Sequence, residues 1–323
     1  MSKTKLIIIV AAVVMVFVGC IIMGVAFVSA GGSFRAMSTD SFVQREVRID
    51  GYFDSVNIRL NTTDLRIEPA RDGNCIIESN LSEKVGLHAE VSGGELVIYE
   101  SDGRRWYDHI SLFSFEGSWM VVYLPQTVYD SLYINVSTSD IVINGGLTFD
   151  LAKIDLSTGD LECRANIQKS LSVDTSSGDL TLSGLDGTDT VTVKTNTGDI
   201  EITDLQNCGS VQAKVSSGSV ELERVAAQTV TVSGRTSDIE LNNVISAGLL
   251  DVSTSSGDIE FARCDGREVV LKTSTGDIEG SFISGKMFDA HASTGNVRVP
   301  ASDRSGGLCK VKTSSGDIKI TVK

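Results

Sequence analysis

The feature that most constrains the fold is a five-residue motif, Ser-Ser-Gly-Asp-Ile, which reads in full at residues 255–259 and recurs from the middle of the chain to the C-terminus. The residues at the aspartate position are Asp140, Asp160, Asp179, Asp199, Ser219, Asp238, Asp258, Asp277, Asn296 and Asp317, and neighbouring numbers differ by 19 to 21. So regular a period is typical of a solenoid, in which each repeat forms one coil that packs on the next.

Apolar and polar residues alternate on both sides of each motif. Around Asp199, the apolar residues Val191 and Val193 precede the motif, and Ile200 and Ile202 follow it. This alternation predicts two short strands per repeat, joined by a corner at the motif. Glycine provides the backbone angles of such a corner, and Ser, Thr and Asp can bond its backbone. We therefore predict an all-β fold, a parallel β-solenoid (β-helix-like) with coils of ~20 residues. At ~4.8 Å per coil, ten coils give a rod of about 50 Å.

The pattern is regular over residues 126–323 and weaker before them. We interpret residues 45–125 as degenerate N-terminal coils with an aromatic insertion, because corner-like sequences occur at Thr62–Leu65 and Ser92–Glu95. The insertion contains both tryptophans, and we expect it to cover the first coils, since the terminal repeats of solenoids are usually atypical.

The C-terminal end shows no obvious cap in the sequence. Four lysines, Lys310, Lys312, Lys319 and Lys323, crowd the last coil. Lysines on an open sheet edge discourage pairing with another edge. The alternative is that they mark a docking end.

Residues 6–30 form an uncharged, strongly apolar stretch. A bilayer needs ~20 apolar residues for a helical span, so we predict a single transmembrane helix here. Lys3 and Lys5 precede it, which places residues 1–5 in the cytoplasm as a short tip. Residues 31–44 are then a spacer, and the rest is an extracytoplasmic domain at the cell membrane. Two alternatives are cleavage after Ala30 and lipid attachment at Cys20.

The charge balance excludes one class of partner. The chain has 28 Lys and Arg against 42 Asp and Glu, a formal net charge of −14. Nucleic-acid-binding proteins carry a basic footprint, so we expect no nucleic acid partner. An acidic surface by itself identifies no other partner.

The repeated aspartates are a candidate metal site. In a solenoid they line one edge, ~5 Å apart, where calcium could bridge their oxygens. The five residues of this candidate calcium ladder are Asp160, Asp179, Asp199, Asp258 and Asp277. The alternative, which we favour, is that these carboxylates bond the backbone or a hydroxyl of the next coil. We therefore predict no cofactor, with calcium as the one candidate.

The only local group of basic and aromatic residues is Arg104, Arg105, Trp106 and Tyr107. It could contact a glycan or a partner protein, and its alternative is a solvated loop. The glycine-rich corners match neither a P-loop nor a dinucleotide-binding motif. We identify no catalytic residue and predict that the protein is not an enzyme.

Several segments together resemble a known family. They are the apolar N-terminus, Phe53-Asp54-Ser55-Val56, Trp106-Tyr107-Asp108, Tyr123-Leu124-Pro125 and the Ser/Thr-x-Gly-Asp-Ile coils. The combination resembles the bacterial putative-adhesin family of unknown function, also called toast-rack domains, typified by the LiaG-like cell-envelope proteins. The resemblance covers about residues 45–323. It implies a β-solenoid, often membrane-anchored, that accompanies cell-envelope stress-response systems. It implies no catalytic residues.

These observations lead to one functional prediction with alternatives. We expect a membrane-anchored, extracytoplasmic β-solenoid that acts as a non-enzymatic binding protein of the cell envelope. Its expected partner is an envelope protein belonging to a stress-response or regulatory system. The alternatives are an adhesin or module that binds wall polymer or glycan and, less favoured, a polysaccharide-active enzyme.

Overall fold

The structure is a computed structural model that describes residues 3–29, 41–103 and 117–323. These residues form helix α1 (Lys3–Ser29) and 23 strands. The strands are β1 (Phe42–Ile49), β2 (Ser55–Leu60), β3 (Asp64–Pro69), β4 (Cys75–Ser82), β5 (Val85–Ser92), β6 (Glu95–Asp102), β7 (Trp119–Leu124), β8 (Val128–Thr138), β9 (Ile141–Ile143), β10 (Thr148–Thr158), β11 (Leu161–Cys163), β12 (Asn166–Ser177), β13 (Leu180–Ser183), β14 (Thr190–Thr197), β15 (Ile200–Ser217), β16 (Val220–Ser233), β17 (Ile239–Ser253), β18 (Ile259–Lys272), β19 (Ile278–Phe282), β20 (Lys286–Thr294), β21 (Val297–Arg298), β22 (Gly307–Ser315) and β23 (Ile318–Val322).

Helix α1 covers most of the predicted membrane anchor. Within the part of the chain that the structure describes, however, no helix is identified as a candidate membrane span. The transmembrane part of the fold prediction, residues 6–30, is therefore not supported. That prediction rested on the length and the apolar character of the uncharged stretch.

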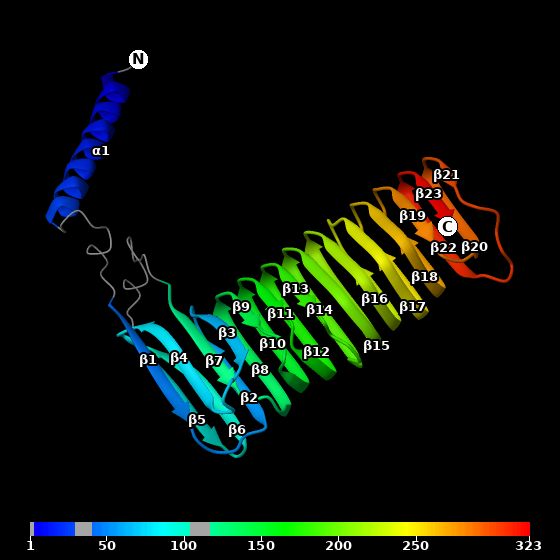
Figure 1. The fold of residues 1–323 in the computed structure, drawn as a ribbon. Helices are drawn as coiled ribbons and strands as arrows, with labels where there is room; N and C mark the ends of the chain where they lie inside the picture. Colours follow the sequence, from blue (N-terminus) through cyan, green and yellow to red (C-terminus); the bar gives the residue numbers. More distant parts are fainter. Residues whose placement is uncertain (1–2, 30–40, 104–116) are drawn as a thin grey trace.

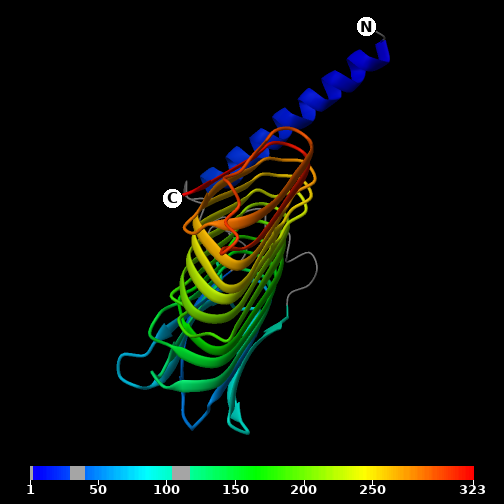
Figure 2. The ribbon, with the colours of Figure 1, turned by 90° about the vertical axis from the view of Figure 1, so that its right-hand side faces the viewer.

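The strands build a parallel β-solenoid of about ten turns, as the repeat predicted (Figure 1). Each coil is flattened, so that the rod has two broad faces, and the coils lie almost directly over one another (Figure 2). Face A includes β8, β10, β12, β14, the second halves of β15 to β18, β22 and β20. Face B includes β9, β11, β13, the first halves of β15 to β18, β19, β23 and β21.

The apolar residues of the repeat form a continuous core between the two faces. Ile200 is 1 % exposed and Val252 is fully buried, and both belong to one cluster that runs from the first coil to the last. The alternation thus predicted the inward positions correctly. The apolar side chains of each coil are buried against those of the coils above and below, so a single coil could not bury its apolar surface alone.

At the C-terminal end, the coils do not stack in chain order. Strand β22 pairs with β18 on one side and with β20 on the other. Strand β23 likewise lies between β19 and β21. The last coil of the chain is therefore second from the end of the rod, and the coil of β20 and β21 is terminal.

The same arrangement occurs at the other end of the rod. Strand β2 lies between β6 and β8, and β3 lies between β7 and β9. The first coil of the chain is thus also covered on both sides. The corner predicted at Thr62–Leu65 joins β2 to β3, as expected.

The two ends of the solenoid differ from the predictions made for them. The expected corner at Ser92–Glu95 is a hairpin turn, because β5 and β6 pair antiparallel. Gly93 and Gly94 both have positive φ, and such a pair reverses the strand direction. At the C-terminal end, the segment between β21 and β22 covers the start of β20: the Phe288 N–H donates to Ser302 Oγ, 3.1 Å, and the Asp303 N–H to the Lys286 carbonyl, 2.9 Å. The lysines of the last coil do not lie on an open edge.

Candidate functional site

The repeated aspartates form a hydrogen-bond ladder along one edge of the rod. Where the neighbouring coil nearer the start of the rod carries an aspartate, the backbone N–H at this position donates to that carboxylate. The Asp179 N–H donates to Asp160 Oδ1 at 2.9 Å, and the Asp199 N–H to Asp179 Oδ1 at 2.8 Å. The Asp277 N–H donates to Asp258 Oδ1 at 2.7 Å. The structure thus brings the five predicted residues into one column and gives them a structural role.

The ladder explains why the column tolerates substitution at two places. Ser219 has no carboxylate, but its N–H and hydroxyl both donate to Asp199 Oδ1, at 2.6 and 2.8 Å. The Asn296 N–H likewise donates to Asp317 Oδ1, at 2.8 Å. Among the described residues, no group of three or more His, Cys, Asp and Glu side chains could hold a metal ion. The calcium site stays an untested prediction.

A second acidic column lies on face B, two residues after the aspartates. Pairing of successive strands places five glutamates directly opposite one another. This glutamate row is Glu201, Glu221, Glu240, Glu260 and Glu279. Neighbours in such a column are ~4.8 Å apart at the backbone. Like charges directly opposite each other on a sheet are destabilising, so the row lowers the stability of the fold.

The electrostatics of the row show this cost at its second member. The pKa of Glu221 is raised, first by desolvation and then by the charges of Glu240, Glu201 and Glu223. Only Glu279, at the end of the row, has a basic partner, Lys319 Nζ at 3.1 Å. For the other four members, no ion pair to another described residue is found. Four of the five carboxylates in the row are therefore uncompensated, and a positive group would stabilise them.

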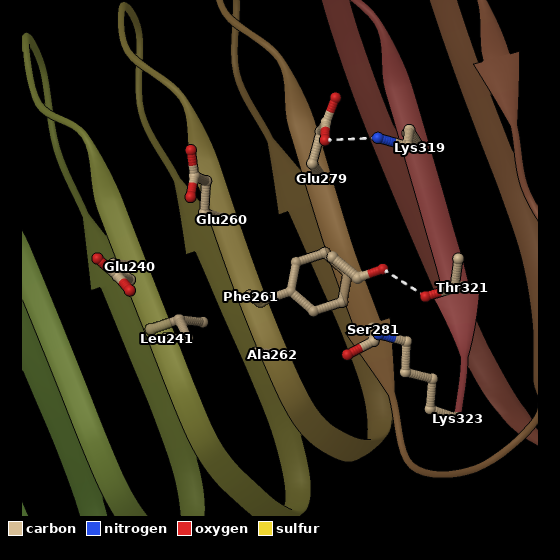
Figure 3. A pocket seen from close by; sticks show the side chains of 11 residues that line it. Glu240, Leu241, Glu260, Phe261, Ala262, Glu279, Ser281, Lys319, Thr321 and Lys323 are labelled. Carbon is tan, nitrogen blue, oxygen red and sulfur yellow. Dashed lines mark hydrogen bonds and ion pairs between the residues drawn. The ribbon is translucent and has the colours of Figure 1, made fainter.

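A groove runs beside the glutamate row across β17, β18, β19 and β23 (Figure 3). Its volume is about 420 Å³. Glu240, Glu260 and Glu279 form one wall, and Lys319 continues that wall in the next coil. The opposite wall of the groove includes the small residues Ala262 and Ser281 and rises less far above the floor.

The floor of the groove follows from the alternation of the strands. Leu241 and Phe261 turn their side chains into the core, so their backbone faces the groove. Gly280 leaves space for the Phe261 ring beneath it, which a Cβ would enter. Ala262 and Ser281 line the low side, and Lys323 lies at the end (Figure 3). The site thus offers carboxylate acceptors in each coil and ammonium donors at one end, over a shallow polar surface.

The remaining predicted interaction residues do not contribute to this site. Arg104, Arg105, Trp106 and Tyr107 lie outside the described residues, so their role stays a prediction. The glutamate row was missed in the sequence analysis. Its signal was present, because a glutamate follows the aspartate position by two residues in five consecutive repeats, but that position was interpreted only as the outward half of a strand.

Several solved structures are similar to this chain. One similar structure is a "putative lipid binding protein" from Parabacteroides distasonis, 15 % identical, with a TM-score of 0.50, covering 88 % of this chain and 98 % of that one. Another is a "putative adhesin" from the same species, 11 % identical, with a TM-score of 0.47, covering 87 % and 98 %. A third is a "putative adhesin" from Bacteroides fragilis, 12 % identical, with a TM-score of 0.39, covering 87 % and 97 %.

Curated proteins give no match to this chain. A protein family, however, matches it twice, over residues 53–209 and again over residues 206–323. The two matches together cover nearly the whole solenoid and meet in its middle, as expected for a stack of similar coils. The resemblance noted in the sequence is thereby confirmed: the chain belongs to the Toastrack DUF4097 family.

Proposed function

We propose that this protein is a non-enzymatic binding rod of the cell envelope that holds an elongated, amino-bearing glycan along the glutamate row of face B. The observation that carries the proposal is the row itself, five carboxylates in register of which four have no basic partner among the described residues. The family and the similar structures support a binding protein in general and leave the ligand open.

The chemistry of the groove favours a glycan with amino groups. The pKa of Glu221 is raised first by desolvation and then by repulsion from the neighbouring carboxylates. Protonated amines placed between these carboxylates would offset the repulsion. Sugar hydroxyls can donate to the remaining carboxylate oxygens and accept from Lys319 and Lys323. A polymer gains from a groove that repeats the same groups in each coil, because each added unit binds without a new loss of translational freedom.

The same surface is less suited to a folded protein partner. Protein interfaces are anchored by buried aromatic and other large apolar side chains. The exposed large apolar residues of the solenoid do not line the groove: Tyr52, Tyr99, Val128 and Leu151 are nearer the start of the rod, and Ile283, Met287, Val297 and Val322 are at its end. An envelope protein partner, expected from the sequence, stays an alternative, and crosslinking in intact cells would test it.

Binding of glucosamine oligomers to the full-length protein in non-ionic detergent tests the proposal. We expect wild type to bind glucosamine oligomers more tightly than their N-acetylated forms. The double variant Glu240→Gln/Glu260→Gln should lower the affinity at least tenfold, which corresponds to ~1.4 kcal/mol.

The matched control removes two acidic charges from face A. Asp155 and Asp174 lie opposite each other in β10 and β12. Asp155→Asn/Asp174→Asn should leave the affinity unchanged, since it alters net charge and not the row. Equal losses in the two variants would show that the oligomer only senses net charge. Shortened oligomers after incubation would favour the alternative of a polysaccharide-active enzyme.

The location at the cell envelope is part of the proposal. It is supported by the uncharged residues 6–30 and by the family resemblance of the chain. If α1 holds the rod at a membrane, the protein should sediment with membranes after alkaline washing and be released by detergent. Deletion of residues 3–29 should free it. A full-length protein that is washed off by carbonate would contradict this.

A further inference from the structure

The end of the rod has the opposite charge from the rest of the chain. We call residues 286–323 the distal tip; they form the last two coils of the stack, β20 to β23. The tip has seven of the 28 Lys and Arg residues and three of the 42 Asp and Glu residues, so its formal charge is +4. The remaining residues have 21 basic and 39 acidic side chains, a formal charge of −18. Such asymmetry indicates a local surface for an anionic partner.

On face A, the basic residues of this end form a column in register. Lys272 of β18 lies opposite Lys312 of β22, and Lys312 lies opposite His291 of β20. The three residues are exposed. For Lys312, no ion pair to another described residue is found. Two lysines directly opposite each other repel, so this column, like the glutamate row, is unfavourable within the isolated fold.

Face B carries a second basic pair on the same two coils. Lys319 of β23 lies opposite Arg298 of β21. They border a cavity of about 510 Å³, whose other lining includes Pro300, Ile320 and Val322. Lys319 forms an ion pair with Glu279, whereas Arg298 has no ion pair to another described residue. The tip therefore presents cations on two opposite sides of the same coils.

We propose that the distal tip binds a linear polyanion with a phosphate in each repeat. Its cations recur at the coil spacing of ~4.8 Å, and a chain of phosphates can meet several of them at once. A flexible chain can also pass around the edge of the rod to reach both faces. A flat bilayer cannot do so, because side chains on the two faces of a solenoid point away from each other. The rest of the rod repels the polymer, which confines it to the tip.

Long-chain inorganic polyphosphate, end-labelled for fluorescence anisotropy, is the probe. The protein is full-length and dispersed in non-ionic detergent. Wild type should bind, with an affinity that falls as salt rises. The variant Arg298→Gln/Lys312→Gln should reduce the affinity about tenfold near physiological salt and lower the slope of log affinity against log salt by about 1 to 2. Both residues are exposed, so the fold should persist; circular dichroism checks this.

The control variant removes two lysines of face A that lie far from the distal tip, nearer the start of the rod. Lys153→Gln/Lys169→Gln changes exposed residues of β10 and β12, each paired with an aspartate. It should bind polyphosphate as wild type does. Equal losses in both variants, or no binding by wild type at low salt, would overturn the proposal.

Two further arms separate the polymer from other anions. Orthophosphate at the same total phosphate concentration should compete poorly, because it lacks the linked repeats; equal competition would indicate a single-anion site and contradict the polymer. Phosphatidylglycerol vesicles should not bind through the tip. Vesicle binding that is lost in Arg298→Gln/Lys312→Gln would assign the tip to a membrane surface instead.

Discussion

At the scale of single residues, the corner of each coil depends on glycine and aspartate together. The aspartate accepts the backbone N–H of the next coil, as Asp179 does from Asp199. The glycine lets two coils approach closely: Gly198 has φ of 127°, and a Cβ there would collide with the Gly178 carbonyl. Both requirements recur in most coils, which is why the motif repeats in the sequence.

Replacement of one corner glycine should destabilise the rod strongly. Gly198→Ala adds a Cβ that meets backbone, in a conformation that L-residues avoid, and we expect a loss of about 3 kcal/mol in the free energy of unfolding. Gly184→Ala is the matched control, because Gly184 also has positive φ, 71°, but open space around it. It should cost about 1 kcal/mol. Denaturant unfolding measures both, and equal losses would refute the close-approach argument.

Residue-level prediction succeeded where a position repeats and failed where its environment is singular. The alternation placed Ile200 and Val252 correctly in the core. Cys75 and Cys208 lie outside the regular columns, so the repeat predicts no environment for them. Both are buried, and burial raises the pKa of the Cys75 thiol to about 12. Burial at irregular positions depends on the packing of neighbouring coils, which sequence alone does not specify.

At the scale of elements, the two ends of the rod share one device, a chain-terminal coil enclosed between two others. At the C-terminal end, the flanking coils are also joined directly across the inserted one. The buried Lys286 of β20 bonds Asp265 of β18 and donates to the Gly266 carbonyl at 2.9 Å. Gly307, the residue of β22 that lies between them, has no side chain to block this contact.

The ion pair should make the stability of this end depend on pH. Burial opposes ionisation of Asp265, but hydrogen bonds from Lys286, Ser284 and the Gly266 N–H outweigh it, and the net pKa is lowered. A lowered pKa in the folded state stabilises the fold above the unfolded value, ~3.9, and this contribution is lost as the pH falls through the folded value. Wild type should therefore lose more stability between pH 5 and about pH 2 than Asp265→Asn does.

A charge-free replacement provides the control for the pair. Lys286→Met alone leaves a half-buried carboxylate without its partner and should cost about 3 kcal/mol at pH 7. Asp265→Leu/Lys286→Met removes both charges and should recover most of that loss. Denaturant unfolding followed at both pH values gives the comparison. If Asp265→Asn follows the wild-type pH dependence, the pair does not have this role.

The order of the coils could not be predicted from the repeat. The period and the alternation predict that each coil packs on another. They do not predict which coil is the neighbour, because any two coils align their apolar residues in the same columns. The placement of β22 beside β18 depends on the long return through residues 299–306, and the hairpin of β5 and β6 depends on two adjacent glycines. Both are local exceptions to a pattern that otherwise predicts the architecture.

At the scale of the whole molecule, the protein is a narrow rod with its charge divided along its length. The glutamate row occupies the middle of face B, and the basic tip follows it. The groove lies where the two meet, at Glu279 and Lys319. A solenoid suits such a division because each coil contributes one row of outward residues, and a substitution in one repeat changes one position along the rod.

The groove on face B is proposed to hold a chain whose units each meet one coil. The most direct test is the affinity of wild type for glucosamine oligomers of increasing length. The groove crosses four strands, a span of ~14 Å at ~4.8 Å per step. We predict that affinity rises with each added sugar until that span is filled and then levels off, and that Glu240→Gln/Glu260→Gln flattens the rise. An affinity that is the same for the monomer and for long oligomers would contradict the account.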